Sequence, residues 1–96
     1  MNEQSNARIE YANVFYRQGL LKNPESRRLM YNLARNCLIL CKFDQAVTWF
    51  EFGLLMKPRW VNGLVGLAVT YFEKGYYSRS VEYITAARKN FKNINH

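Results

Sequence analysis

Few residues of this 96-residue chain have a type and spacing that could support chemistry. Cys37 and Cys41 would share one face of a helix, but helical geometry does not favour a disulfide between them. The only histidine is His96, so a zinc site lacks ligands and a Ser/His/Asp arrangement lacks its base. Gly63 and Gly66 do not form a phosphate loop and are expected to serve helix packing. The sequence therefore predicts no catalytic residue, no metal site and no cofactor.

The composition favours a folded, soluble protein with a charged partner. Hydrophobic residues make up 49% and aromatic residues 16%, too much for a disordered chain. Fourteen Lys and Arg against seven Asp and Glu give a charge of +7, which suits nucleic acid, an anionic membrane surface or an acidic protein. No apolar stretch is long enough to span a bilayer, and the free cysteines fit a reducing compartment. We expect an intracellular protein, first of all in the cytoplasm, with the cilium and an organelle matrix left open.

The elements that must position any functional residues are expected to be five helices with short connections. Apolar residues recur at helical spacing, and no stretch alternates as a strand, so the expected fold class is all-α. The expected helices span about 7–22, 27–40, 44–57, 59–74 and 78–91. Asn23-Pro24 should end the first helix and Gly75 the fourth. The expected N-caps are Ser26, Asp44 and Ser78.

The chain repeats itself with a period of 34 residues, the separation of Pro24 from Pro58. Small and large residues recur in register at this period. The matching sets are Ala12, Ala46 and Ser80; Gly19, Gly53 and Ala87; Tyr16, Phe50 and Ile84; Leu33 and Leu67; and Ala34 and Ala68. Small residues recur where helix backbones must approach closely, and large residues where they fill the space beside them. The pattern predicts stacked helix pairs.

This pattern resembles the tetratricopeptide repeat (TPR) family. Its slots are occupied by Met30, Leu33, Ala34 and Cys37 on the first helix, then by Ala46, Phe50, Gly53 and Pro58. Departures from the family pattern are Cys37 for an aromatic residue, Gly53 for Ala, and Lys92 for the last proline. Pentatricopeptide repeats usually have a period of 35, and half-a-tetratricopeptide repeats of RNA-processing scaffolds are a further alternative.

The resemblance covers nearly the whole chain. It divides residues 7–92 into a half repeat at 7–24 and two full repeats at 27–60 and 61–92. Flexible ends are expected at 1–6 and 93–96. The implied architecture is a right-handed α-solenoid of antiparallel helix pairs. The implied function is non-catalytic protein–protein interaction, as an adaptor or scaffold subunit or as a segment of a larger assembly. The alternative is a basic helical-repeat protein that contacts RNA within a ribonucleoprotein complex.

The resemblance also implies a concave groove lined by the first helices of the two full repeats. Its expected lining is Arg28, Tyr31, Asn32, Arg35, Asn62, Val65, Val69 and Phe72. Such a surface suits a peptide or helix with acidic and apolar residues. The carboxylate clamp of some family members is not expected, because Asn62 and Gly66 occupy its Lys and Arg slots.

Two further surfaces are expected to meet other proteins. Trp49, Phe52 and Leu55, with Leu21 in the slot equivalent to Leu55, would form an outer-face docking patch, or else be partly buried against adjacent helices. At the ends of the array a neighbouring subunit or further repeats are expected, because a solenoid repeat cannot bury its apolar face alone. Tyr83, Ile84 and Ala87 are expected to lie on the terminal surface.

Overall fold

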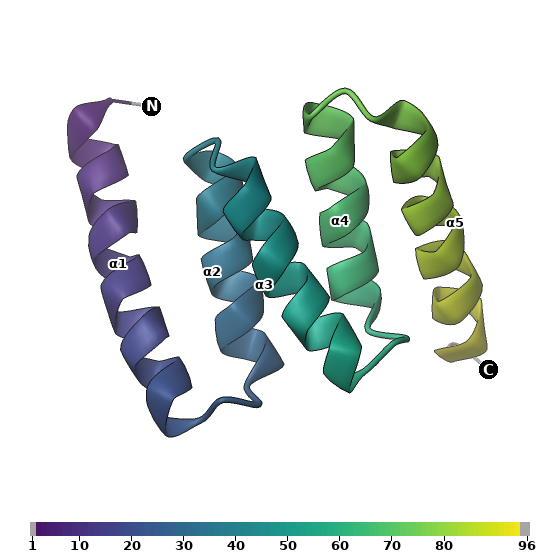
Figure 1. Cartoon of the computed structure of the whole chain (residues 1–96), viewed down its shortest axis with the longest axis horizontal. Coiled ribbons are helices and arrows are strands. Elements are labelled where there is room, and N and C mark those ends of the chain that lie inside the picture. The colour runs from purple at the N-terminus through teal and green to yellow at the C-terminus, as the bar shows by residue number, and fades with distance from the viewer. Residues whose placement is uncertain (1, 95–96) are drawn as a thin grey trace.

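The computed structural model describes residues 2–94, with the side chains of residues 2–91. Within this range the chain forms five α-helices and no strand, so the all-α expectation is confirmed (Figure 1). The helices are α1 (Glu3–Lys22), α2 (Arg27–Ile39), α3 (Phe43–Met56), α4 (Val61–Glu73) and α5 (Tyr77–Ile94). Each helix runs antiparallel to the next, so α1 and α3 point in the same direction (Figure 1).

The expected helix ends are partly confirmed and partly wrong. Asn23 is the C-cap of α1, and the Ser26 hydroxyl accepts a 3.2 Å hydrogen bond from the Leu29 N–H at the start of α2. Asp44 and Ser78 are not N-caps. They lie in the first turns of α3 and α5, because these helices begin one residue earlier than expected.

The first and last helices are longer than the sequence suggested. Asn2 caps α1, since its side chain accepts a 2.8 Å hydrogen bond from the Ser5 N–H, and the helix then includes residues 3–6 of the stretch expected to be flexible. At the other end α5 continues to Ile94. Residues 1, 95 and 96, which belong to the two ends expected to be flexible, lie outside the described residues.

The turns that follow α2 and α4 have the same geometry one repeat apart. Cys41 has φ +60° and Gly75 has φ +86°, so both residues lie in the left-handed region. In the first turn the Lys42 N–H donates to the Cys37 carbonyl and the Cys41 N–H to the Leu38 carbonyl. The second turn forms the same two bonds. Gly75 thus ends its helix as expected, and Cys41 takes the glycine role in the preceding repeat.

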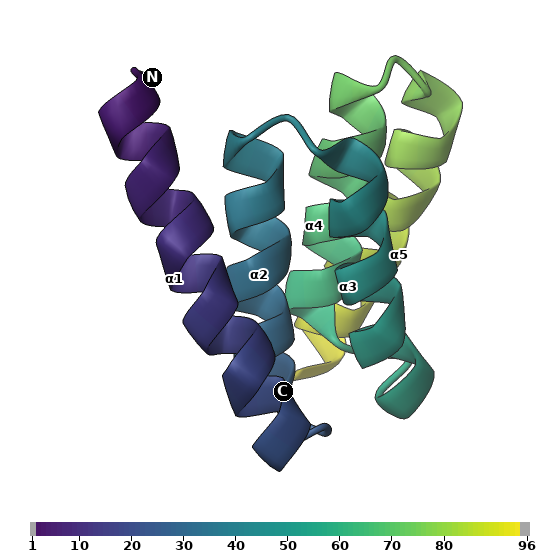
Figure 2. The same ribbon diagram turned by 60° about the vertical axis from the view of Figure 1, so that its left-hand side comes forward.

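The stacking order separates an inner from an outer face. Successive helices pack against each other, and α2 also contacts α4 directly. Among the described residues, α1, α3 and α5 make no such contact with one another. Figures 1 and 2 show α3 displaced to one side of α2 and α4. The first helices of the repeats, α2 and α4, therefore form the inner face, and α1, α3 and α5 form the outer face.

Most of the core is built from residues that recur at the 34-residue period, and Trp60 is an addition to them. The larger cluster comprises Ala34, Cys37, Ala46, Phe50, Trp60, Leu67 and Tyr71. A smaller cluster of Leu20, Met30 and Leu33 joins α1 to α2. Burial raises the pKa of the Cys37 thiol above its ordinary value, so this cysteine is a neutral core residue, while Cys41 is exposed.

Two aromatic side chains explain the helix glycines. A Cβ on Gly53 would lie 2.2 Å from Cζ3 of Trp60, and one on Gly63 would lie 2.3 Å from Cε3 of the same ring. A Cβ on Gly66 would lie 2.3 Å from two carbons of the Phe50 ring. The rings occupy the space that side chains would need. The departure from the TPR pattern at Gly53 therefore follows from the neighbouring tryptophan.

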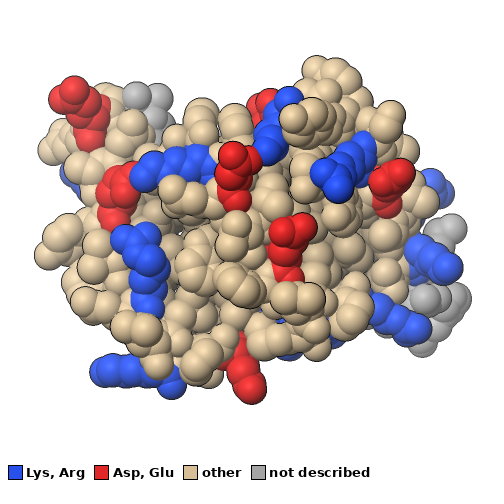
Figure 3. Space-filling model, viewed as in Figure 1, with Lys and Arg blue, Asp and Glu red and all other residues tan. Residues whose placement is uncertain are grey.

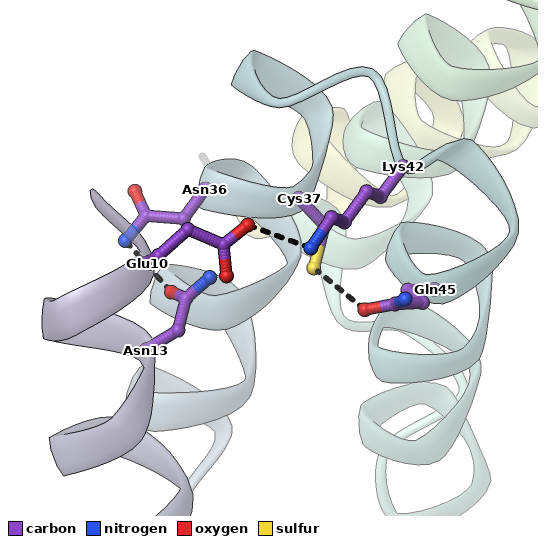
Figure 4. Close-up of polar contacts among 6 residues, drawn as sticks. All are labelled: Glu10, Asn13, Asn36, Cys37, Lys42 and Gln45. Atoms are coloured by element: carbon purple, nitrogen blue, oxygen red, sulfur yellow. Dashed lines mark hydrogen bonds and ion pairs between the residues drawn. The ribbon is translucent and has the colours of Figure 1, made fainter. Parts of the chain in front are cut away.

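A set of polar contacts joins α1, α2 and α3 at one end (Figure 4). The Lys42 ammonium lies 2.6 Å from a carboxylate oxygen of Glu10, and both side chains are partly exposed. The amide of Asn36 donates a 2.9 Å hydrogen bond to the side-chain oxygen of Asn13, which is only 2% exposed. The buried amide is thus satisfied, as buried polar groups must be. These contacts fix α1 against the first full repeat.

Candidate interaction surfaces

The four groove residues expected on α2 share one exposed side of that helix. Arg28, Asn32 and Arg35 lie three or four residues apart, so their side chains follow one another along the helix. Arg28 and Arg35 are exposed, whereas Asn32 and Tyr31 are half-buried. Tyr31 packs edge-on against Phe50 and Trp60, with ring centroids 6.2 and 6.5 Å apart. It therefore forms the junction of α2 with the core, and the two arginines form the charged edge.

The four groove residues expected on α4 also share one side and are more apolar. Val65, Val69 and Phe72 are three or four residues apart and are all exposed, as is Asn62 one turn earlier. Phe72 packs edge-on against Tyr77, with centroids 5.3 Å apart. Since the buried residues Leu64, Leu67, Ala68 and Tyr71 occupy the other side of the helix, the exposed strip is not part of the core. It is a ready contact surface.

The direct contact between α2 and α4 places these two strips next to each other on the inner face. The surface is then an arginine-bearing edge beside an apolar strip, and we call it the inner surface: Arg28, Tyr31, Asn32, Arg35, Asn62, Val65, Val69 and Phe72. These eight residues include no acidic side chain, although Glu73, four residues after Val69 on α4, is also exposed. The arrangement suits a segment with apolar residues on one side and acidic residues on the adjacent side.

The residues expected in the outer patch are divided between two clefts. The first outer cleft, about 580 Å³, lies between α1 and α3 and is mostly apolar. Its lining is Val14, Arg17, Gln18, Leu20, Leu21, Pro24, Met30, Trp49 and Phe52. The second outer cleft, about 420 Å³, lies between α3 and α5 and is lined by Glu51, Leu54, Leu55, Leu67 and Tyr83. Trp49 and Phe52 thus belong to one cleft and Leu55 to the other.

Sequence reasoning named Trp49 and Phe52, with Leu21 in the slot equivalent to Leu55, but missed the other α1 residues of the first outer cleft. The missing residues are Val14, Arg17 and Gln18, which lie on the same side of α1 as Leu21. The 34-residue period could have identified them, because Gln18 is the position equivalent to Phe52 and Leu21 is the position equivalent to Leu55. The sequence alone does not show that α1 and α3 leave this space open.

The expectation for the C-terminal surface is wrong for one residue. Ala87 is only 3% exposed, since α5 packs extensively against α4. Tyr83 is half-buried and stacks on Tyr71, with ring centroids 5.6 Å apart and planes 4° from parallel. Ile84 is exposed as expected. Ala87 and Tyr83 lie toward α4, because the apolar side of α5 packs against that helix.

A third cavity, of about 830 Å³, lies at the turn between α4 and α5. Tyr71, Tyr76 and Tyr77 line it together with two cations. The Lys74 ammonium pairs with Asp44, and this hydrogen bond raises the pKa of the lysine. The Arg79 guanidinium lies over the Tyr71 ring, 4.9 Å from its centroid. Both cations are engaged within the chain, so we interpret this cavity as part of the turn that joins the helices.

The charges do not gather into a single basic surface on the face seen in Figure 3. Lys and Arg side chains are interspersed there with Asp and Glu and separated by uncharged residues. A nucleic-acid interface favours basic side chains gathered in a patch or stripe. Among the described residues no group of three or more His, Cys, Asp or Glu could hold a metal ion. None of the helices in residues 2–94 is long and apolar enough to cross a membrane.

Comparisons with known proteins match the fold and not the sequence. No protein-family model matches the sequence, and no curated protein matches it. The structure is similar to a crystal structure of MamA, a TPR protein, with TM-score 0.86 and 17% identity over 92% of this chain. It is also similar to MamA AMB-1 (TM-score 0.83, 17% identity, 91% of this chain) and MamA MSR-1 (0.84, 18%, 94%).

The chain spans about half of the MamA chains that it matches: 52% of the first two and 51% of the third. At these identities the likeness concerns the fold. It confirms the expected all-α arrangement of TPR-like antiparallel helix pairs.

Proposed function

We propose that this chain, whose fold is that of TPR-type helical repeats, is a non-catalytic module that binds another protein and acts as an adaptor or scaffold part of a larger assembly. The observation that carries the proposal is the exposed apolar strip on α4 beside the arginine edge of α2. Val65, Val69 and Phe72 are exposed, although seven of the thirteen residues of α4 are buried. An apolar strip that the chain itself leaves uncovered favours contact with a partner.

The inner surface suggests the chemistry of its partner. Arg28 and Arg35 are two helical turns apart, a separation of about 10 Å at about 1.5 Å per residue. Two acidic side chains could face them from one helix at positions i and i+7, or from an extended segment about three residues apart. Apolar side chains between the acids would cover Val65 and Val69. We therefore propose a partner segment that alternates acidic and apolar contacts.

A nucleic-acid partner is the alternative, and the excess of basic residues supports it. The charge of +7 would attract RNA without regard to sequence. Against it stand the interspersed charges of the face in Figure 3. Of the two candidates, a protein partner accounts for the apolar strip as well as for the arginines.

Affinity purification of three forms of the chain, with and without nuclease, tests the proposal. The forms are wild type, the double variant Arg28→Glu/Arg35→Glu on the inner surface, and a control, Arg88→Glu/Lys89→Glu, with the same charge change on exposed residues of α5. We expect the same protein partner with wild type and control. Its recovery should fall about tenfold or more with the inner-surface variant, because reversal puts like charges opposite the partner's acids.

Two outcomes would contradict this proposal. Equal recovery with the inner-surface variant would show that these arginines do not contact the partner. Release of the partner by nuclease would favour the RNA alternative instead. Helical circular dichroism and melting curves of all three forms establish that each one is folded, so that a loss of binding is not a loss of structure.

A further inference from the structure

The two outer clefts share four equivalent lining positions at the repeat period. Leu21 and Pro24 of the first cleft lie 34 residues before Leu55 and Pro58, and Trp49 lies 34 before Tyr83. Leu20 and Leu54 correspond in the same way. Because α1 and α3 run in the same direction (Figure 1), equivalent residues follow one another in the same order along the two helices.

The most exposed apolar side chains of the outer face occupy one of these equivalent positions. Leu21 is 84% exposed and Leu55 is 79% exposed, the highest fractions among the large apolar residues described. Phe52, one turn before Leu55, is 47% exposed. Leu21 and Leu55 are thus exposed at equivalent positions, and each lines an outer cleft. Exposed apolar side chains of this kind favour contact with another molecule.

The charged residues of the two clefts have opposite signs at equivalent positions. Arg17 lines the first outer cleft and Glu51 lines the second, 34 residues later. Both side chains are exposed. A two-fold rotation that exchanges the positions of α1 and α3 brings the positive charge on α1 of one copy opposite the negative charge on α3 of the other. The surface is therefore complementary in charge to a second copy of itself. Charge and apolar exposure thus follow the same symmetry.

We propose that the outer face binds a second copy of this chain, with a two-fold axis that is parallel to α1 and α3 and runs above the outer face, over the space between them. This axis places α1 of each copy over α3 of the other. Arg17 of one copy then faces Glu51 of the other, and Leu21 faces Leu55 of the other. Each contact forms twice, so the contact closes on itself as a dimer. The outer face belongs to a body of 40 × 32 × 20 Å, which is broad enough for an interface of about 800 Å² per copy.

The net charge sets the conditions under which this dimer forms. Two copies of charge +7 repel each other at low ionic strength. At an ionic strength of about 0.15 M the screening length is about 8 Å, which weakens the long-range repulsion more than the short contacts between Arg17 and Glu51. Association should therefore be measured near that ionic strength.

Sedimentation velocity of the whole chain from about 1 to 200 µM tests the proposal, and charge exchange makes the test specific. Wild type should sediment as a mixture that shifts from monomer to dimer with concentration. Arg17→Glu and Glu51→Arg should each raise the dissociation constant about tenfold or more, because each places like charges face to face twice. The double variant Arg17→Glu/Glu51→Arg should regain dimerisation, since it restores both pairs with their signs exchanged.

Matched variants separate the contact from general effects of charge. Arg8→Glu makes the same charge change on an exposed part of α1 outside the cleft and should leave the dissociation constant unchanged. Leu21→Ala/Leu55→Ala, which alters only exposed side chains, should abolish dimerisation without loss of helical circular dichroism. A monomer at every concentration, or a double charge variant no better than the single ones, would overturn the proposal.

The test is independent of the function proposed for the inner surface. Arg28→Glu/Arg35→Glu alters the opposite face, so it should dimerise like wild type. Conversely, Leu21→Ala/Leu55→Ala should retain the partner recovered by affinity purification. If the outer-face variants lost that partner and the protein were monomeric, the outer face would bind a different protein and the dimer would be excluded.

Discussion

At the scale of single residues, the turn after α2 carries a backbone conformation that its side chain disfavours. Cys41 has φ +60° where the equivalent position one repeat later is Gly75. A left-handed conformation costs a residue with a Cβ about 1 kcal/mol more than it costs glycine. The hydrogen bonds of the turn are the same in both repeats, so the surrounding structure holds Cys41 in this conformation.

Replacement of Cys41 by glycine should therefore stabilise the chain. We expect Cys41→Gly to raise the free energy of unfolding by about 1 kcal/mol, and thus the melting temperature by about 4 to 8 °C for a domain of this size. Gly75→Ala should lower both by similar amounts. Cys41→Ala is the control, because it removes the exposed thiol and keeps the strain. Thermal melts of the three variants that show no difference between glycine and alanine at position 41 would contradict this account.

At the scale of the elements, aromatic rings set the distance between the helices. Phe50 on α3 is only 1% exposed and lies against Gly66 of α4, while Trp60 fills the space beside Gly53 and Gly63. The rings replace side chains that the neighbouring helices would otherwise carry. Close approach of α3 and α4 therefore depends on glycines that are poor helix formers by themselves.

Gly66→Ala should destabilise the protein although alanine is the better helix former. The helix preference favours alanine by about 1 kcal/mol, but its Cβ would lie 2.3 Å from the Phe50 ring, and overpacking typically costs about 1 to 3 kcal/mol. We expect a net loss of stability in urea unfolding. In the background Phe50→Leu, which removes the ring, Gly66→Ala should become neutral or stabilising. Equal effects in both backgrounds would show that the ring contact is not responsible.

Much of this element structure could be predicted from the sequence, and the exceptions have local causes. The 34-residue register gave the helix pairs and most of the core, because packing forces small and large residues to recur. Asp44 and Ser78 were wrongly expected to be N-caps. In each turn a single residue separates the left-handed Cys41 or Gly75 from the helix that follows, so α3 begins at Phe43 and α5 at Tyr77. Asn2 was missed because α1 has no preceding helix pair with which to align it.

At the scale of the whole molecule, the helices are unequally supported. Of the other described helices, α1 contacts only α2, whereas α2, α3 and α4 each have neighbours on two sides. The polar contacts of α1 with the first full repeat are few, and its ion pair between Glu10 and Lys42 is partly exposed, where such pairs contribute little. Stability should therefore decrease from the middle of the array toward α1.

Native-state hydrogen exchange should show this gradient. We expect amides in the middle of α1 to exchange faster than those in the middle of α2, α3 and α4, because a helix with one neighbour opens without unfolding the rest. Measurement at two concentrations, below and above dimer formation, serves as a control, since docking on the outer face should slow exchange in α1. Equal protection in α1 and α3 at low concentration would contradict the gradient.

The interaction surfaces were less predictable than the fold. The residues of the inner surface followed from the resemblance to the TPR family, in which the first helices of the repeats line a groove. The outer clefts could not be predicted, because they depend on the distances from α1 to α3 and from α3 to α5, and no residue pattern gives those distances.

The two tryptophans give the molecule a built-in pair of optical reporters. Trp60 is held between two glycines in the middle of the core, while Trp49 is half-buried at the rim of the first outer cleft. Their indole emission therefore responds to different events: that of Trp60 to disruption of the packed interior, and that of Trp49 to the loss of water at the outer face. In Trp49→Phe and Trp60→Phe variants each signal can be followed alone, so folding and docking can be observed separately without an added dye.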